Sequence, residues 1–291
     1  MVSKKDTPAA SRFPWMICCE CIMINFVHRY KVEPKSKVSL RRWEPGDHRA
    51  FSGEKKDAER VLLKLTEQLS QLQEVLYAEH KHKILIIFQA MDTGGKDGTI
   101  KAVFREMAPQ GIHVSSFKVP TAEELDHDYL WRIHKCGPAK GEIVLFNRSH
   151  YEDLLTVRVH QLVPEDVWRK RFAQINDFER MLAEEGTTII KFYLNISKKE
   201  QKKRLQERSE DPTKRWKFSP NDLSERKLWE EYMKAYEDVF SLTSTAYAPW
   251  YIVPADRNWY RNLCVATIVV DALKKLKMKY PRPRLNRHRQ V

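Results

Sequence analysis

Five short apolar runs constrain the fold of this chain more than any other feature of its sequence. The strongest, residues 83–88, reads KILIIF, and similar runs occupy residues 142–146, 187–194 and 250–253, with a weaker one at residues 113–117. Short runs rich in β-branched residues are typical of strands buried on both faces of a parallel sheet. Segments with helical patterns separate them, which implies right-handed βαβ crossovers. The sequence therefore predicts an α/β fold with three layers around a central parallel sheet of about five strands.

Helical patterns lie between and around these runs. Leucines recur at spacings of three and four between residues 57 and 80, which predicts a helix with one apolar stripe. The stripe covers only about two heptads, so we interpret it as core packing and not as a coiled coil. Two further long helices are expected at residues 221–245 and 258–277.

A glycine-rich loop directly follows the first strong run. It reads QAMDTGGKDGT over residues 89–99 and leads into a helical segment, which is the context of a phosphate-binding P-loop. In such a loop, backbone N–H groups and the positive end of the helix bind phosphate oxygens, and the lysine adds a point charge. Ala90 and Asp97 depart from the pattern G-x-x-x-x-G-K-[ST], and the alternative is a turn that only connects strand and helix. The residues expected to bind phosphate are Gly94, Gly95, Lys96 and Gly98.

Two carboxylates accompany this loop, Asp92 and Asp97. Beside a phosphate site they would repel the ligand unless a cation lay between them. Mg²⁺ binds carboxylate and phosphate oxygens together with water, so it is the expected cofactor, with Mn²⁺ as the alternative ion. We expect Asp92 and Lys96 to take part directly in catalysis.

A polar block, NRSHYED, follows the run at residues 142–146. Ligands bind at the carboxyl ends of parallel strands in open sheets, so this block should lie close to the P-loop. Arg148 is the expected catalytic clamp for phosphate charge, and Asn147, Glu152 or Asp153 are candidate metal ligands. We interpret His150 as structural, because an attacking phosphate oxygen is already anionic and needs no general base.

A basic segment broken by prolines spans residues 204–221. We expect it to form a helical lid that closes over phosphates and excludes water, and its alternative interpretation is a solvated loop. The cations expected to contact phosphate there are Arg208, Lys214, Arg215 and Lys217.

The charge of the chain points to a polyanionic partner. Its 291 residues include 52 Lys and Arg against 39 Asp and Glu, a formal net charge of +13. Such an excess suits nucleic acid, an anionic membrane or polymeric phosphate, and charge alone does not choose among them. We expect one domain at residues 28–280, an atypical extension at residues 1–27 and a basic tail at residues 281–291.

The extension predicts neither a membrane span nor a zinc site. Its apolar stretch at residues 13–27 contains Glu20 and is shorter than the roughly 20 residues that a spanning helix needs. Its three cysteines are too close together for tetrahedral zinc ligation. They are Cys18, Cys19 and Cys21. We therefore expect a cytoplasmic protein.

These motifs resemble those of the polyphosphate kinase 2 family, over roughly residues 28–280. Residues 92–98 are similar to the family's acidic Walker A loop, residues 146–153 to its Walker B block and residues 211–217 to its lid. The segments YAPWY and PADR, near residue 250, resemble its last strand and the start of the following helix. The resemblance implies a P-loop kinase fold related to thymidylate kinase, metal dependence, and reversible phosphoryl transfer between polyphosphate and nucleotides.

The resemblance also implies roles for individual residues. Asp92 is then the main metal-linked carboxylate, Lys96 and Arg148 are phosphate ligands, and Asp97 is a further metal ligand. Asn147 stands where branches that use only nucleoside diphosphates carry aspartate, and Glu152 stands where they usually carry asparagine. Both departures resemble the branch that accepts nucleoside mono- and diphosphates, so the expected reaction converts AMP to ADP and ADP to ATP.

Two other functions remain open from the sequence. An ATP-dependent nucleotide kinase would share the P-loop and the lid but needs no long basic track. A non-catalytic polyanion-binding protein would use the basic segments but leaves the P-loop carboxylates without a purpose, and nucleic acid is the less favoured partner. We expect a homo-oligomer, either a dimer or a tetramer.

Overall fold

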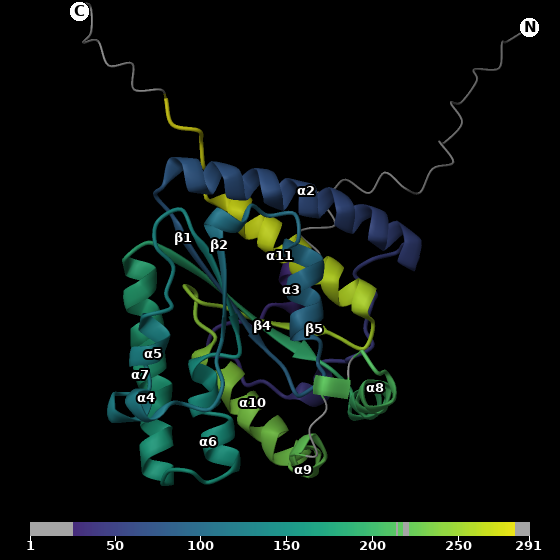
Figure 1. The fold of residues 1–291 in the computed structure, drawn as a ribbon, viewed down its shortest axis with the longest axis vertical. Coiled ribbons are helices and arrows are strands. Elements are labelled where there is room, and N and C mark those ends of the chain that lie inside the picture. The colour runs from purple at the N-terminus through teal and green to yellow at the C-terminus, as the bar shows by residue number, and fades with distance from the viewer. Residues whose placement is uncertain (1–25, 214, 218–220, 283–291) are drawn as a thin grey trace, which may run out of the picture.

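A five-stranded parallel sheet runs through the centre of the molecule (Figure 1). The computed structural model describes residues 26–213, 215–217 and 221–282. The strand order is β2-β3-β1-β4-β5, and all four neighbouring pairs are parallel. The predicted α/β fold with a central parallel sheet is confirmed. The strands are β1 (Lys83–Gln89), β2 (Ile112–Ser116), β3 (Ile143–Asn147), β4 (Thr187–Asn195) and β5 (Trp250–Pro254).

The strongest and the weakest of the five apolar runs correspond to strands that differ in burial. In β1, every residue from Ile84 to Phe88 is fully buried, because strands and helices surround it on all sides. Strand β2 lies at an edge, and its Val114 remains 53% exposed. The side chains of β2 are partly exposed, so this strand needs fewer apolar residues, whereas β5 at the other edge is covered by residues 31–32 and is buried along its length.

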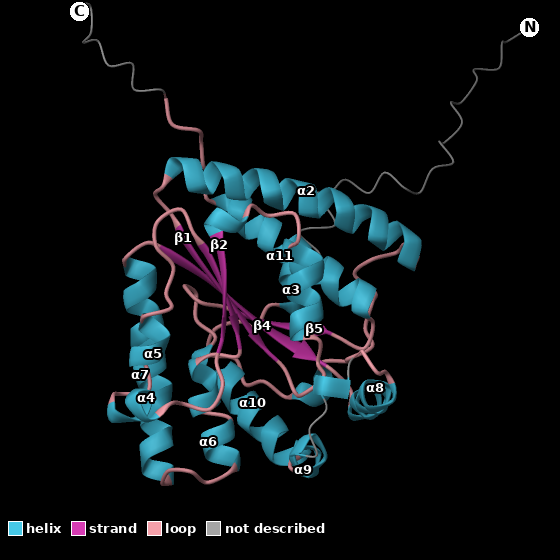
Figure 2. Ribbon diagram, viewed as in Figure 1, coloured by secondary structure: helices cyan, strands magenta, loops and turns pink. Residues whose placement is uncertain are grey.

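Helices cover both faces of the sheet, as Figure 2 shows. On one face lie α2 (Lys55–Glu79), α3 (Lys96–Phe104) and α11 (Asn258–Lys275), and α2 begins with a capping box between Glu54 and Asp57. The predicted helices at residues 57–80 and 258–277 are therefore confirmed. The other helices are α4 (Ala122–Asp126), α5 (Trp131–His134), α6 (Thr156–Val159), α7 (Glu165–Glu184), α8 (Lys198–Glu210), α9 (Asn221–Lys227) and α10 (Trp229–Thr243), with single 3-10 turns η1 (Leu40–Arg42), η2 (Pro109–Gly111), η3 (His150–Asp153) and η4 (Arg215–Lys217).

The predicted single helix at residues 221–245 is wrong. Two helices, α9 and α10, meet at Leu228, whose ψ of 16° leaves the helical region. The seven residues of α9 are mostly polar, whereas the apolar stripe that packs against the sheet starts with Trp229. The polar segment therefore has no reason to follow the direction of α10.

The segment before α2 wraps around the far edge of the sheet. Lys31 forms an antiparallel bridge with Tyr251, and the Val32 amide donates to the carbonyl of Trp250 at 2.8 Å. Phe26 and Val27, the last two residues of the expected extension, are buried in the core. Their apolar side chains belong to the same core cluster as the sheet. In the described part of the chain, no helix is long and apolar enough to cross a membrane.

Candidate active site

The loop between β1 and α3 has the backbone geometry of a phosphate-binding loop. The Gly94 amide donates to the Met91 carbonyl at 2.9 Å, which closes a tight turn. Gly95 caps α3 with a φ of 98°, a conformation that glycine adopts without steric cost. A Cβ atom at Gly95 would also collide with the guanidinium of Arg261. The loop therefore directs the first N–H groups of α3 toward the space beyond the strand end.

Lys96 places its ammonium group inside this loop. Its Nζ donates to the carbonyl of Ala90 at 3.0 Å. Burial and the nearby Arg148 lower the pKa of Lys96, while Asp92 and other carboxylates act in the opposite direction. An anionic ligand in the loop would add negative charge that balances the positive charges of Lys96 and Arg148.

Arg148 follows the neighbouring strand β3 and faces the loop. Its amide donates to the carbonyl of Phe88 at 3.1 Å, and its φ of 64° lies in the left-handed region. The guanidinium Nη2 lies 3.1 Å from Oδ1 of Asp92. Burial alone would lower the pKa of Arg148, but Glu152 and Asp92 outweigh it and raise that pKa. The side chain thus stays charged and is held over the loop by a strained backbone.

The predicted metal ligands lie on both sides of Arg148. Asp97 accepts a hydrogen bond of 2.7 Å from Nδ2 of Asn147, and Glu152 accepts one of 2.7 Å from Thr156. In the residues that the structure describes, no three His, Cys, Asp or Glu side chains gather into a metal-binding group.

Two cavities meet at Asp92 and Arg148. The larger, of about 860 Å³, is lined by the P-loop from Asp92 to Gly98 and by Lys118, Arg208 and Trp216. The smaller, of about 350 Å³, has carboxylates, aromatic rings and an imidazole in its wall. Its side chains include Glu152, His160, Asp222, Glu225, Tyr232 and Tyr236. One ligand in each cavity would therefore approach the same pair of charged residues.

Only part of the predicted lid reaches these cavities in the described residues. Arg208, from α8, lines the larger cavity and forms an ion pair of 3.4 Å with Asp222. Arg215 was expected to contact phosphate, but its Nε donates to the Ser209 carbonyl at 3.0 Å and it does not line either cavity. The short η4 turn directs its side chain back to the end of α8. Lys214, the Lys217 side chain and the cysteines Cys18, Cys19 and Cys21 lie outside the described part of the chain.

Two arginines that support the P-loop were missed from the sequence. Arg204, on α8, donates to the carbonyls of Thr93 and Ala255 at 3.3 and 2.6 Å, which ties the loop to the end of β5. Arg261, on α11, is 3% exposed and packs beneath Gly95. Burial, with a smaller effect of Arg204, lowers the pKa of Arg261 to about 9. Arg204 lies in the basic segment at residues 204–221, whereas no sequence pattern around Arg261 indicated that it contacts the P-loop.

His150 belongs to a buried network beneath the Arg148 loop. Its Nε2 lies 3.2 Å from Oε1 of Glu179, and both side chains are fully buried. Glu179 also accepts from Tyr151 at 2.8 Å and from Lys191 at 2.6 Å. His150 lines neither cavity, which agrees with its structural interpretation.

The parallel sheet, the loop at the end of β1 and the cationic cavity above it define a P-loop phosphotransferase. The comparisons with known proteins give the family. The family model "Polyphosphate kinase 2 (PPK2)" matches residues 52–281, and the chain belongs to this family. The family is generally metal-dependent.

Several relatives of the chain are named for the reaction they catalyse. An AMP/ADP-polyphosphate phosphotransferase of Meiothermus ruber is 56% identical over 255 residues, which cover 88% of this chain and 96% of the relative. An ADP-polyphosphate phosphotransferase of Rhodopseudomonas palustris is 43% identical, with 87% and 91% covered. The crystal structure of polyphosphate kinase 2 from Arthrobacter aurescens TC1 superposes with a TM-score of 0.84 at 43% identity, covering 88% of this chain and 94% of that one.

Proposed function

We propose that this protein transfers the terminal phosphoryl group of inorganic polyphosphate to AMP and to ADP, in a reversible, Mg²⁺-dependent reaction. The observation that carries the proposal is the meeting of two cavities at Asp92 and Arg148. The activities for which the relatives from M. ruber and R. palustris are named support the choice of substrates.

We assign the larger cavity to polyphosphate. Its wall combines the P-loop with Lys96, Lys118 and Arg208, and a chain of phosphates needs both backbone donors and spaced cations. The smaller cavity is assigned to the acceptor nucleotide. Its carboxylates and His160 suit the donors and acceptors of a base and a ribose, and Arg148 is within reach of the nucleotide phosphate.

The transfer step needs alignment and charge neutralisation. An anionic oxygen of the acceptor phosphate attacks the terminal phosphorus, the bond from that phosphorus to the chain breaks, and the shortened chain keeps the electron pair. No proton moves. Lys96 and Arg148 neutralise charge on the transferring group from two sides, and removal of one such group typically costs about 3 to 4 kcal/mol of barrier.

The metal would be held on the acidic side of the loop. Asp92 and Asp97 are the carboxylates of the larger cavity, Asn147 lies against Asp97, and Glu152 borders the smaller cavity. When bound, Mg²⁺ (or Mn²⁺) supplies the positive charge that screens these carboxylates from phosphate oxygens. We further propose that the protein works in the cytoplasm as a homo-oligomer, a dimer or a tetramer.

Chromatography of nucleotide products tests the function. The purified protein receives Mg²⁺ and polyphosphate with AMP or with ADP, beside the variants Asp92→Asn and Asp126→Asn. Asp126 is exposed on α4 and lines neither cavity, so it is a matched control. We expect ATP from both acceptors, a loss of at least about 100-fold in rate for Asp92→Asn, and no change for Asp126→Asn.

The same assay separates the alternatives. Product from ADP alone would contradict the assignment of AMP as an acceptor. Product that requires ATP as the donor would favour the ATP-dependent nucleotide kinase. No turnover with any donor, together with salt-sensitive binding of duplex DNA, would favour a polyanion-binding protein.

A further inference from the structure

A second cationic cavity lies on the segment that precedes α2. It has a volume of about 490 Å³ and shares no lining residue with the two cavities of the candidate active site. Its wall comes mainly from residues 29–49 and is completed at the ends of β4 and β5. Five cationic side chains line it, namely Arg29, Lys31, Lys37, Arg42 and Arg49.

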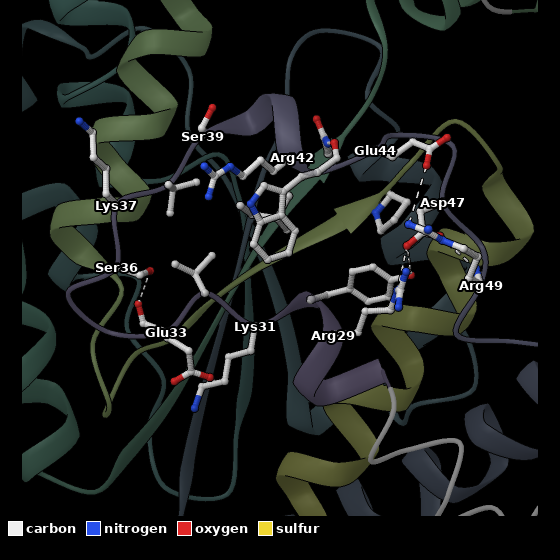
Figure 3. A pocket seen from close by; sticks show the side chains of 17 residues that line it. Arg29, Lys31, Glu33, Ser36, Lys37, Ser39, Arg42, Glu44, Asp47 and Arg49 are labelled. Carbon is white, nitrogen blue, oxygen red and sulfur yellow. Dashed lines mark hydrogen bonds and ion pairs between the residues drawn. The ribbon is translucent and has the colours of Figure 1, made fainter.

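One side of this cavity is a preorganised pair of guanidinium groups. The carboxylate of Asp47, which is 7% exposed, accepts from Nε of Arg29 at 2.9 Å and from Nε of Arg49 at 2.7 Å. Burial alone would raise the pKa of Asp47, but the hydrogen bonds from Arg49 and Arg29 outweigh it and hold that pKa well below its usual range. Asp47 therefore stays ionised and fixes both arginines, which Figure 3 shows together at one side of the cavity.

Among the described residues, no carboxylate lies at ion-pair distance from the remaining cations. Lys31, Lys37 and Arg42 form no ion pair within the described residues, and Figure 3 shows them spaced around the hollow. The cavity thus carries five cations against only three carboxylates. Positive charge that gathers in a concave site concentrates anions, because the low-dielectric walls focus its field.

The shape and the spacing of charge indicate the kind of anion. A volume of about 490 Å³ exceeds what one phosphate ion needs and lies within the usual range of ligand sites. Cations spaced along different walls match a ligand that carries charge on several linked groups. Trp43 adds a half-buried indole to the lining.

We propose that this cavity is an accessory binding site for a linear oligophosphate, separate from the site of transfer. The ligand is a short inorganic polyphosphate segment or the phosphate chain of a nucleoside triphosphate. The proposal does not depend on catalysis, and its test measures binding alone.

Calorimetric titration with tripolyphosphate tests the site. The full chain first carries Lys96→Ala and Arg148→Ala, which weaken the transfer site, and this parent is expected to keep one site. Adding K31Q, K37Q and R42Q should weaken its binding about tenfold or more, because each cation contributes charge-assisted contacts. Adding K64Q, K140Q and K277Q, at three exposed lysines outside all three cavities, removes the same charge and should leave affinity within about twofold.

The outcomes are decisive. Equal weakening by both triple variants would show attraction to overall charge and would overturn the proposal, as would a parent that binds no tripolyphosphate. A parallel titration with ATP distinguishes the two candidate ligands, a polyphosphate segment and a nucleoside triphosphate. Equal affinity for both ligands supports recognition of the phosphate chain alone, and tighter ATP binding that Trp43→Ala removes supports an added contact between base and indole. Unchanged thermal unfolding of the K31Q, K37Q and R42Q variant confirms that its fold is intact.

Discussion

At the scale of the residue, acceptor choice is the property that single side chains can control. Asn147 donates to Asp97 at 2.7 Å, and Glu152 lines the smaller cavity. The double variant Asn147→Asp, Glu152→Asn places a second carboxylate against Asp97 and removes one from the acceptor side. We expect kcat/KM for AMP to fall about tenfold or more relative to that for ADP, because specificity follows the contacts of one substrate in the transition state.

Steady-state kinetics with each acceptor check this prediction. Glu123→Gln, at an exposed residue of α4, is the control and should leave both values unchanged. An equal loss for AMP and ADP would mean that the two positions support the site without selecting its acceptor.

The sequence was informative about residues whose role is local. Gly94, Gly95 and Lys96 follow a buried strand directly, and this context defines their backbone conformation. Arg261 could not be recognised, because its contact with Gly95 joins parts of the chain more than 150 residues apart. The contact of Arg215 with phosphate stays a prediction, since composition predicts a cation but not the direction in which a short turn points it.

At the scale of the element, the junction of β1 and α3 depends on the absence of a side chain. Gly95→Ala introduces strain at a φ of 98° and a collision with Arg261. We expect a loss of stability of about 1 to 2 kcal/mol from the backbone alone, and a loss of activity because the first amides of α3 are displaced. Urea denaturation and the transfer assay measure the two effects.

Variants at two other glycines separate the effect of the positive φ from the effect of the collision with Arg261. Gly186 has a similar φ of 86° but open space around its Cβ position, so Gly186→Ala should lose stability and keep activity. Gly46 has neither constraint, and Gly46→Ala should change stability by less than about 0.5 kcal/mol. Full activity in Gly95→Ala would contradict the proposed role of the loop backbone.

The division between α9 and α10 marks the limit of prediction for elements. Helical periodicity continues across Leu228, so the sequence alone predicts one helix. Only the position of the sheet determines that the apolar stripe of α10 packs while the polar α9 turns away. Long buried strands and long amphipathic helices were predictable because their buried positions require apolar residues at a regular spacing.

At the scale of the whole molecule, one buried network joins elements from across the fold. Lys191 of β4 donates to Glu179 of α7 at 2.6 Å, to Tyr151 of η3 at 2.8 Å and to the Thr243 carbonyl of α10 at 2.7 Å. Lys191 and Glu179 are both fully buried. Although burial alone raises the pKa of Glu179, Lys191 and His150 outweigh it and keep that pKa below its ordinary value. Glu179 therefore contributes stability above the pKa of its unfolded state, and this is lost as the pH falls through the folded-state pKa.

Removing one partner should destabilise the entire fold. Lys191→Met leaves Glu179 buried without its counter-ion, and we expect a loss of about 3 to 5 kcal/mol in the free energy of unfolding at pH 7. The loss should be smaller at pH 5, because the isolated carboxyl can then take up a proton instead of remaining charged in the core. Urea denaturation at both pH values measures the difference.

Two further variants give this prediction its controls. Adding Glu179→Gln removes the unpaired charge, so the double variant should recover part of the lost stability. Lys170→Met, at an exposed lysine of α7 that lies 3.7 Å from Asp166, should change stability by less than about 0.5 kcal/mol. If Lys191→Met changed the free energy of unfolding as little as Lys170→Met, the buried network would not contribute to the stability of the fold. A large loss that is greater at pH 7 than at pH 5 would instead show that the charge pair helps to join the Arg148 loop, the sheet and the helices of one face into a single unit.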